Sequence, residues 1–153
     1  MDHNIPFRLA GFWNLTGATF TTLDGTVHEP WGPSPKGISI ITEGGDCSTH
    51  VMRTDRQPFS SEHPSPGEKE RAFDEYFSYF GRFLKFDKDQ GAIIIRIVGA
   101  TNPNWTDKEL TRYLDVIDED HFVIRTPPVT FSSLEVVGRL SWTRRREETP
   151  IIR

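Results

Sequence analysis

Two arginines in the middle of apolar runs are the residues best placed to do chemistry. Arg112 alternates with apolar residues along 110–116, and Arg96 does so along 94–98, although the opposite face of that second run is equally apolar. Alternate residues of a strand share one face. Each guanidinium would therefore lie on a buried face, where an isolated charge costs several kcal/mol unless it has a partner.

Two kinds of partner are open for these arginines. A bound ligand would have to offer a carboxylate, an enolate or another electron-rich oxygen, which a guanidinium stabilises. A structural salt bridge would instead use a carboxylate of this chain, and the candidates are Asp74, Glu75, Glu109 and Asp115.

His50 and Tyr113 are the candidate proton-transfer groups. His50 lies in the middle of the run Asp46–Arg53, and histidine is the side chain that changes charge closest to neutral pH. The alternative is an exposed or hydrogen-bonded strand histidine. Tyr113 is a weaker candidate, because it follows Arg112 directly and the two side chains cannot line one cavity without a bulge. We therefore predict catalytic roles for His50, Arg96, Arg112 and Tyr113.

The sequence predicts neither a metal nor a cofactor. The other four histidines lie at termini or in loops, and no H-x-H or H-E-x-x-H spacing occurs. Cys47 is the single cysteine, so a thiolate cluster is excluded and a packed strand residue is expected. There is no phosphate-binding glycine loop, no G-x-S-x-G elbow and no dinucleotide fingerprint.

Composition narrows the class of protein. The 153 residues include 18 Lys and Arg against 22 Asp and Glu, a net charge of −4, so we expect no nucleic-acid partner. No apolar run approaches the roughly 18 residues of a membrane span, and the first residues lack a basic and apolar leader. We expect one cytoplasmic domain over residues 1–153 without a membrane partner, and a homodimer stays open.

The elements that position these residues are short apolar runs separated by turns. They are rich in β-branched and aromatic residues, which is the pattern of antiparallel strands. We predict eight strands: Arg8–Thr22, Gly37–Thr42, Asp46–Arg53, Arg82–Asp87, Gly91–Gly99, Glu109–Val116, His121–Thr126 and Glu135–Arg144. Joined by short turns, they favour a mainly β fold, a single up-and-down antiparallel barrel whose interior holds side chains or one small ligand.

One segment has helical spacing. Apolar residues recur in that pattern over Ser65–Phe80, between the third and fourth predicted strands. Ser65 and Glu68 form an S-x-x-E capping box, and Gly81 is expected to end the helix. The Pro-rich stretch ahead of it, residues 55–66, is expected to be a surface loop leading into a lid or plug.

Aromatic residues are the candidate ligand contacts. Trp31 and Trp105 lie in Pro-flanked loops, where a large apolar side chain is expected to pack or to bind something, so we predict them at the barrel mouth. Tyr76 is predicted to line the cavity. The core face of the helix is expected to consist of Phe73, Phe77 and Phe80.

Several segments resemble the small lipocalin-like domain family of bacteria and fungi. They are the G-x-W motif of Gly11-Phe12-Trp13 and, in order, the runs 31–38, 51–59, 72–74, 79–81, 103–105 and 125–128. The resemblance implies a β-barrel with a ligand cavity. It also implies that Trp13 on the first strand and Arg144 on the last meet at the closed end. The disulfides of classical secreted lipocalins are absent from this chain, so the transport function of those secreted proteins is not inferred for it.

Fungal members of that family are often associated with secondary-metabolite pathways. The resemblance therefore admits a cofactor-independent isomerase or cyclase acting on a small, largely apolar or aromatic molecule of polyketide or terpenoid type. Orientation and water exclusion would supply part of the rate. The alternatives are a non-catalytic carrier or sequestering protein with the same pocket, and a structural module whose barrel is filled by its own side chains.

Overall fold

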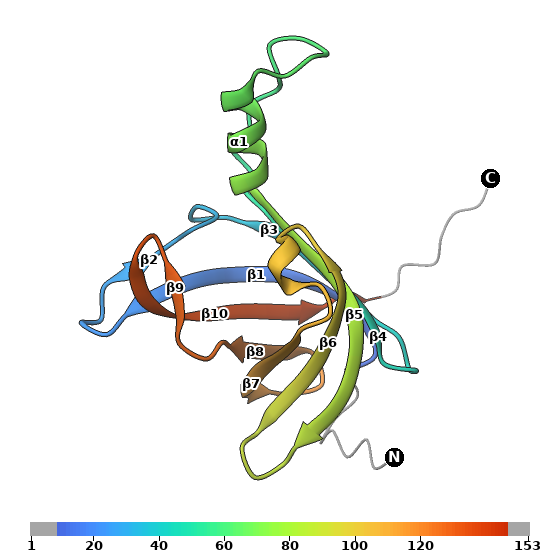
Figure 1. The fold of residues 1–153 in the computed structure, drawn as a ribbon. Helices are drawn as coiled ribbons and strands as arrows, with labels where there is room; N and C mark the ends of the chain where they lie inside the picture. Colours follow the sequence, from blue (N-terminus) through green and yellow to red (C-terminus); the bar gives the residue numbers. More distant parts are fainter. Residues whose placement is uncertain (1–8, 147–153) are drawn as a thin grey trace, which may run out of the picture.

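Eight antiparallel strands form a closed barrel in the computed structural model, which describes residues 9–146 (Figure 1). The barrel strands are β1 (Gly11–Thr22), β3 (Lys36–Ile41), β4 (Asp46–Met52), β5 (Tyr76–Asp87), β6 (Ala92–Ala100), β7 (Glu109–Ile117), β8 (His121–Arg125) and β10 (Leu134–Arg144). Neighbours in this order are hydrogen-bonded, and the pairing of β1 with β10 closes the sheet. Closure removes the exposed edges that an open sheet would have.

These eight strands confirm the predicted meander and the mainly β class. Two short strands were not predicted: β2 (Val27–His28) pairs with the end of β1, and β9 (Val129–Phe131) forms a hairpin with β10. The helix α1 (Pro66–Asp74) follows β4 rather than the third strand of the chain, because β2 precedes β3 in the count.

The helix is shorter than predicted. Its start is confirmed, since the Ser65 hydroxyl accepts from the amide of Glu68 and the Glu68 carboxylate accepts from the amide of Ser65. The helix ends at Asp74, however, and β5 begins at Tyr76. Residues 76–82 pair with β4 in a continuous ladder, and this tertiary pairing overrides a local helical spacing.

Two predictions drawn from the longer helix are wrong. Gly81 lies inside β5 and not at a helix end. Phe73 and Phe80 are 53% and 54% exposed, so they do not belong to the core, whereas Phe77 packs against it. Successive side chains of a strand point to opposite faces, so Phe77 and Tyr79 point inward and Phe80 points outward.

The helix α1 stands outside the barrel wall and does not plug it (Figure 1). None of its residues is buried, and only Phe73 and Asp74 at its end reach the edge of the barrel cavity. The expected lid or plug is therefore not what the helix forms in this structure. Within residues 9–146, no helix is long and apolar enough to cross a membrane.

The two ends of the barrel differ. One end carries the short turns that join β3 to β4, β5 to β6 and β7 to β8, and it is closed by Trp13, which is fully buried. The indole N–H of Trp13 donates to the carbonyl oxygen of Leu9, and Phe122 packs edge-on against the ring at 4.6 Å. The other end carries the long connections, α1, β9 and the 3₁₀ helix η1 (Pro103–Trp105).

Candidate ligand-binding cavity

A cavity of about 470 Å³ lies inside the barrel. Side chains from all eight barrel strands line it, and most of them are apolar, including the buried Ile93 and Ile95 of β6. Small-molecule sites in proteins typically measure about 300–1,000 Å³. The barrel is thus not filled by its own side chains, which disfavours the purely structural module.

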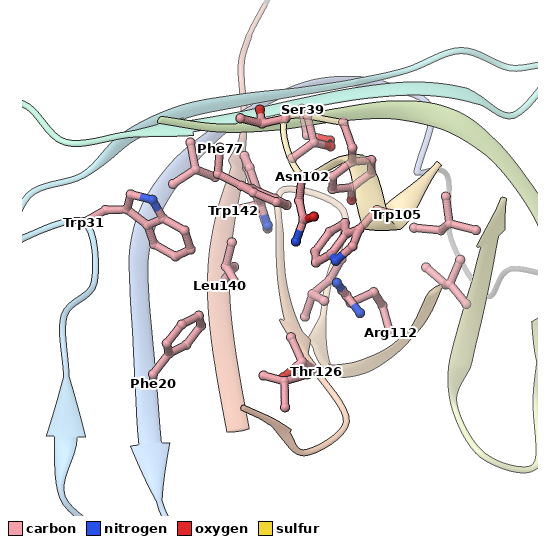
Figure 2. Close-up of a pocket in the computed structure, with 18 of the residues that line it drawn as sticks. Phe20, Trp31, Ser39, Phe77, Asn102, Trp105, Arg112, Thr126, Leu140 and Trp142 are labelled. Atoms are coloured by element: carbon pink, nitrogen blue, oxygen red, sulfur yellow. The ribbon is translucent and has the colours of Figure 1, made fainter. Parts of the chain in front are cut away.

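Aromatic rings form one part of the cavity wall (Figure 2). Phe77 on β5 packs edge-on against Trp105, with 4.9 Å between ring centres, and lies 6.2 Å from Trp31. Phe20 on β1 packs edge-on against Trp31 at 5.6 Å. Rings fixed by such contacts offer rigid apolar surface to a flat ligand. Trp31, in the connection between β2 and β3, and Trp105, in the connection between β6 and β7, both line the cavity at its open end.

A capped 3₁₀ turn directs Trp105 inward. The side-chain oxygen of Asn102 accepts from the amide of Asn104 at 3.0 Å, and the Asn102 carbonyl accepts from the amide of Trp105 at 3.1 Å. The short-range hydrogen bonds hold the segment after β6 in a tight turn. The indole therefore folds back over the barrel interior instead of extending into solvent.

A row of hydroxyl groups crosses the cavity wall on three neighbouring strands. Ser39 on β3, Thr49 on β4 and Tyr79 on β5 lie opposite one another in the strand registers, and all three are buried. The Ser39 and Thr49 hydroxyl oxygens are 2.9 Å apart. Burial raises the pKa of the Tyr79 phenol, although the charge of Arg112 and a hydrogen bond with Thr49 act against this shift. At neutral pH the phenol therefore keeps its proton and acts as a donor.

Arg112 is the charged side chain that reaches the interior. Its guanidinium carbon lies 5.7 Å from the centre of the Trp105 ring, and its Nη1 donates to the carbonyl oxygen of Thr111 at 2.8 Å. Burial lowers the pKa of this guanidinium, and interaction with Tyr79 acts in the opposite direction. Within the described residues, no carboxylate forms an ion pair with Arg112. The salt-bridge alternative therefore does not apply to it there.

The other residues predicted as catalytic lie outside the cavity. His50 alternates with inward-facing neighbours on β4 and belongs to the outer wall. Arg96 is exposed on β6 and forms an ion pair with Glu109 at 2.9 Å, which is the structural alternative. Tyr113 faces outward because Arg112 faces inward, and the Arg125 guanidinium lies 4.6 Å above its ring. Among the four residues predicted as catalytic, Arg112 therefore lines the cavity, whereas His50, Arg96 and Tyr113 do not.

His50 and Tyr76 form a hydrogen-bonded pair at the edge of the barrel. The Nδ1 atom of His50 lies 2.7 Å from the Tyr76 hydroxyl, and its Nε2 atom lies 3.1 Å from the hydroxyl of Ser48. Both residues line an open groove on the outer wall, and Tyr76 also touches the edge of the cavity. Tyr76 is thus a boundary residue and not a deep lining one.

Sequence reasoning missed the hydroxyl row. Thr49 could have been found from strand alternation, because the buried Cys47 and Val51 share its face. Tyr79 was hidden by the helix prediction, which placed it outside the core face. Ser39 gives a misleading signal, because Ile38 and Ile40 make the opposite face of β3 the more apolar one.

A closed meander of eight strands around a largely apolar cavity defines the class of up-and-down β-barrels with an internal pocket. The chain belongs to the lipocalin-like domain family, whose model matches residues 10–145. Among solved structures, a redesigned β-barrel is similar at 15% sequence identity and a TM-score of 0.40, over 91% of this chain and 92% of that one. A comparison with curated proteins gave no match.

Proposed function

We propose that this protein binds a small, largely apolar or aromatic molecule in the barrel cavity. The observation that carries the proposal is the cavity of about 470 Å³, because a barrel of this size that served only as a scaffold would pack its interior. The rings of Phe77, Trp105 and Trp31 support an aromatic or polyene-like ligand, since they offer rigid flat surface.

A cofactor-independent isomerase or cyclase of secondary metabolism is the finer form of this proposal. It is supported by the side chains of Arg112 and Tyr79, which bring a positive charge and a proton donor beside a largely apolar space. Such a site orients a substrate, excludes water and stabilises negative charge that develops on an oxygen. In this form the proton-transfer role predicted for His50 and Tyr113 passes to Tyr79, and the charge-stabilising role predicted for Arg96 or Arg112 falls to Arg112.

A non-catalytic carrier is the alternative, and it uses the same cavity. Native mass spectrometry of the freshly purified protein tests binding first, because a co-purifying molecule identifies the ligand directly. Incubation of that molecule with the protein then separates the two forms, since a catalyst returns an isomer or a cyclised product and a carrier returns the molecule unchanged.

A neutral aromatic dye tests the location of binding. We expect Nile red to fluoresce on addition to the protein, and we expect Phe77→Ala to weaken its binding by about threefold to tenfold. Phe80→Ala is the matched control, because Phe80 lies three residues away on β5 and is largely exposed. If both substitutions weaken binding equally, or if neither substitution changes it, the cavity is not the binding site.

A further inference from the structure

The position of Arg112 specifies the ligand further. Resting on the proposed function, we propose that the cavity takes an organic acid, a flat apolar molecule whose carboxylate or ionised enol binds the guanidinium of Arg112 beside the phenol of Tyr79. The apolar body would lie against Phe77 and Trp31, toward the open end of the barrel. Figure 2 shows Arg112 on the side of the cavity opposite Trp31 and Phe20.

The first argument is the missing counter-charge. Arginines on the outer wall have carboxylate partners: Arg96 pairs with Glu109, and Arg125 pairs with Asp115 at 3.1 Å. The guanidinium of Arg112 is instead enclosed by the barrel, yet its contacts within the described residues are a backbone carbonyl and the Trp105 ring. A buried charge needs more compensation than an exposed one, so the free barrel carries a positive charge that a bound anion would neutralise.

The second argument is the number of unused donors. A guanidinium has five N–H groups, and one hydrogen bond from Arg112, to the carbonyl of Thr111, occurs among the described residues. The protonated phenol of Tyr79, which is hydrogen-bonded with Thr49, lies near this guanidinium. A site with several donors and a positive charge favours a ligand group that only accepts, and a carboxylate or an enolate is such a group.

The third argument is the placement of the remaining charge around the cavity. The other charged residue that touches it is Asp74, which lies at the end of α1 and is exposed. Water screens a charge in that position. Asp74 therefore contributes little to the electrostatic potential inside the barrel, and the charge of Arg112 dominates it.

A matched pair of probes tests the proposal. Isothermal titration calorimetry compares 2-naphthoate with 2-naphthamide, because the two share a ring system and differ in charge. We expect the acid to bind about tenfold or more tightly, and we expect Arg112→Gln to remove this preference while leaving amide binding within about twofold. Arg112→Lys keeps the charge but not the planar fork, so an intermediate loss is expected.

The outcomes separate this inference from the proposed function. Arg96→Gln is the control, because Arg96 lies on the outer wall and should leave both affinities unchanged. Equal binding of acid and amide in the native protein would overturn the organic-acid inference and leave the cavity function intact. Binding of neither probe would overturn both.

Thermal unfolding gives a second, independent readout. If the charge of Arg112 lacks compensation in the free barrel, Arg112→Met should raise the melting temperature of the unliganded protein by a few degrees. The same variant should lose the stabilisation that 2-naphthoate gives the native protein. A lower melting temperature for Arg112→Met would show that the guanidinium supports the structure, and the inference would be wrong.

Discussion

The guanidinium of Arg144 lies over the indole of Trp13, with 4.2 Å between the guanidinium carbon and the ring centre. The same side chain donates to the carbonyl oxygens of Ala10 and Glu119, each at 2.8 Å. It therefore joins the first strand, the last strand and the turn between β7 and β8. The contact that the family resemblance implied is present at the closed end of the barrel, opposite the cavity mouth.

Removal of the Arg144 side chain should destabilise the barrel. We expect Arg144→Ala to lower the free energy of unfolding by about 2–3 kcal/mol, because two hydrogen bonds from a charged donor and a cation–π contact are lost and the Trp13 ring is uncovered. Urea denaturation measures this change. Arg145→Ala is the control, since Arg145 stacks on Phe12 at 4.8 Å on the exposed side and should matter much less. Similar losses for both variants would contradict the proposed closing role.

Gly81 should tolerate no side chain. A Cβ atom added there would meet the backbone carbonyl of Arg96 on the neighbouring strand, so we expect Gly81→Ala to cost about 3 kcal/mol or to prevent folding. Gly17→Ala on β1 is the matched control, because nothing lies within 4 Å of the position of its Cβ. Melting temperatures of the two variants give the comparison. A cost near 1 kcal/mol at Gly81 would instead suit the helix end that the sequence indicated.

The hydroxyl pair of Ser39 and Thr49 should behave as a unit. Thr49→Val leaves the buried Ser39 hydroxyl without this partner, so we expect a loss of about 1–2 kcal/mol. The double variant Ser39→Ala/Thr49→Val removes both groups and should cost less than the two single losses added together. A double-mutant cycle in urea measures the difference, and additive effects would show that the two hydroxyls act independently.

Glu68 should hold the start of α1 down to strongly acidic pH. Hydrogen bonds from the amides of Ser65 and Ser60 lower the pKa of its carboxyl from 4.5 to about 2. Because the folded pKa is depressed, the stabilisation is fully present above about pH 4.5 and is lost as the pH falls toward 2. Amide exchange at Ser65 and Ser60, followed from pH 5 to pH 2, reports the loss. Glu68→Gln should show no such transition, and a midpoint near 4.5 in the native protein would contradict the prediction.

Cys47 should be chemically silent in the folded protein. Its side chain is buried on the inner face of β4, and burial raises the pKa of the thiol to about 11. Because the thiolate is the reactive form, we expect very slow reaction with a disulfide reagent at pH 8 and fast reaction in urea. Rapid labelling of the native protein would show that this part of the wall opens easily.

Local features of the sequence determined the strands, the start of the helix and the family. Alternation and turn residues depend on neighbours a few positions apart, and the box of Ser65 and Glu68 satisfies amides within one helical turn. The predicted end of the helix was wrong because the pairing of residues 76–82 with β4 competes with the local helical spacing. That competition is invisible in a short window of sequence.

The cavity and its chemistry were decided by closure of the barrel. On β6 both faces are apolar, so only the pairing of distant strands determines that Arg96 faces solvent while Ile95 faces inward. The same closure places Arg112 inside and His50 on the outer wall, although each lies in the middle of a strand in the sequence. Which face of a strand becomes interior is a property of the whole sheet. The sequence therefore indicates the candidate side chains but does not determine which of them face the cavity.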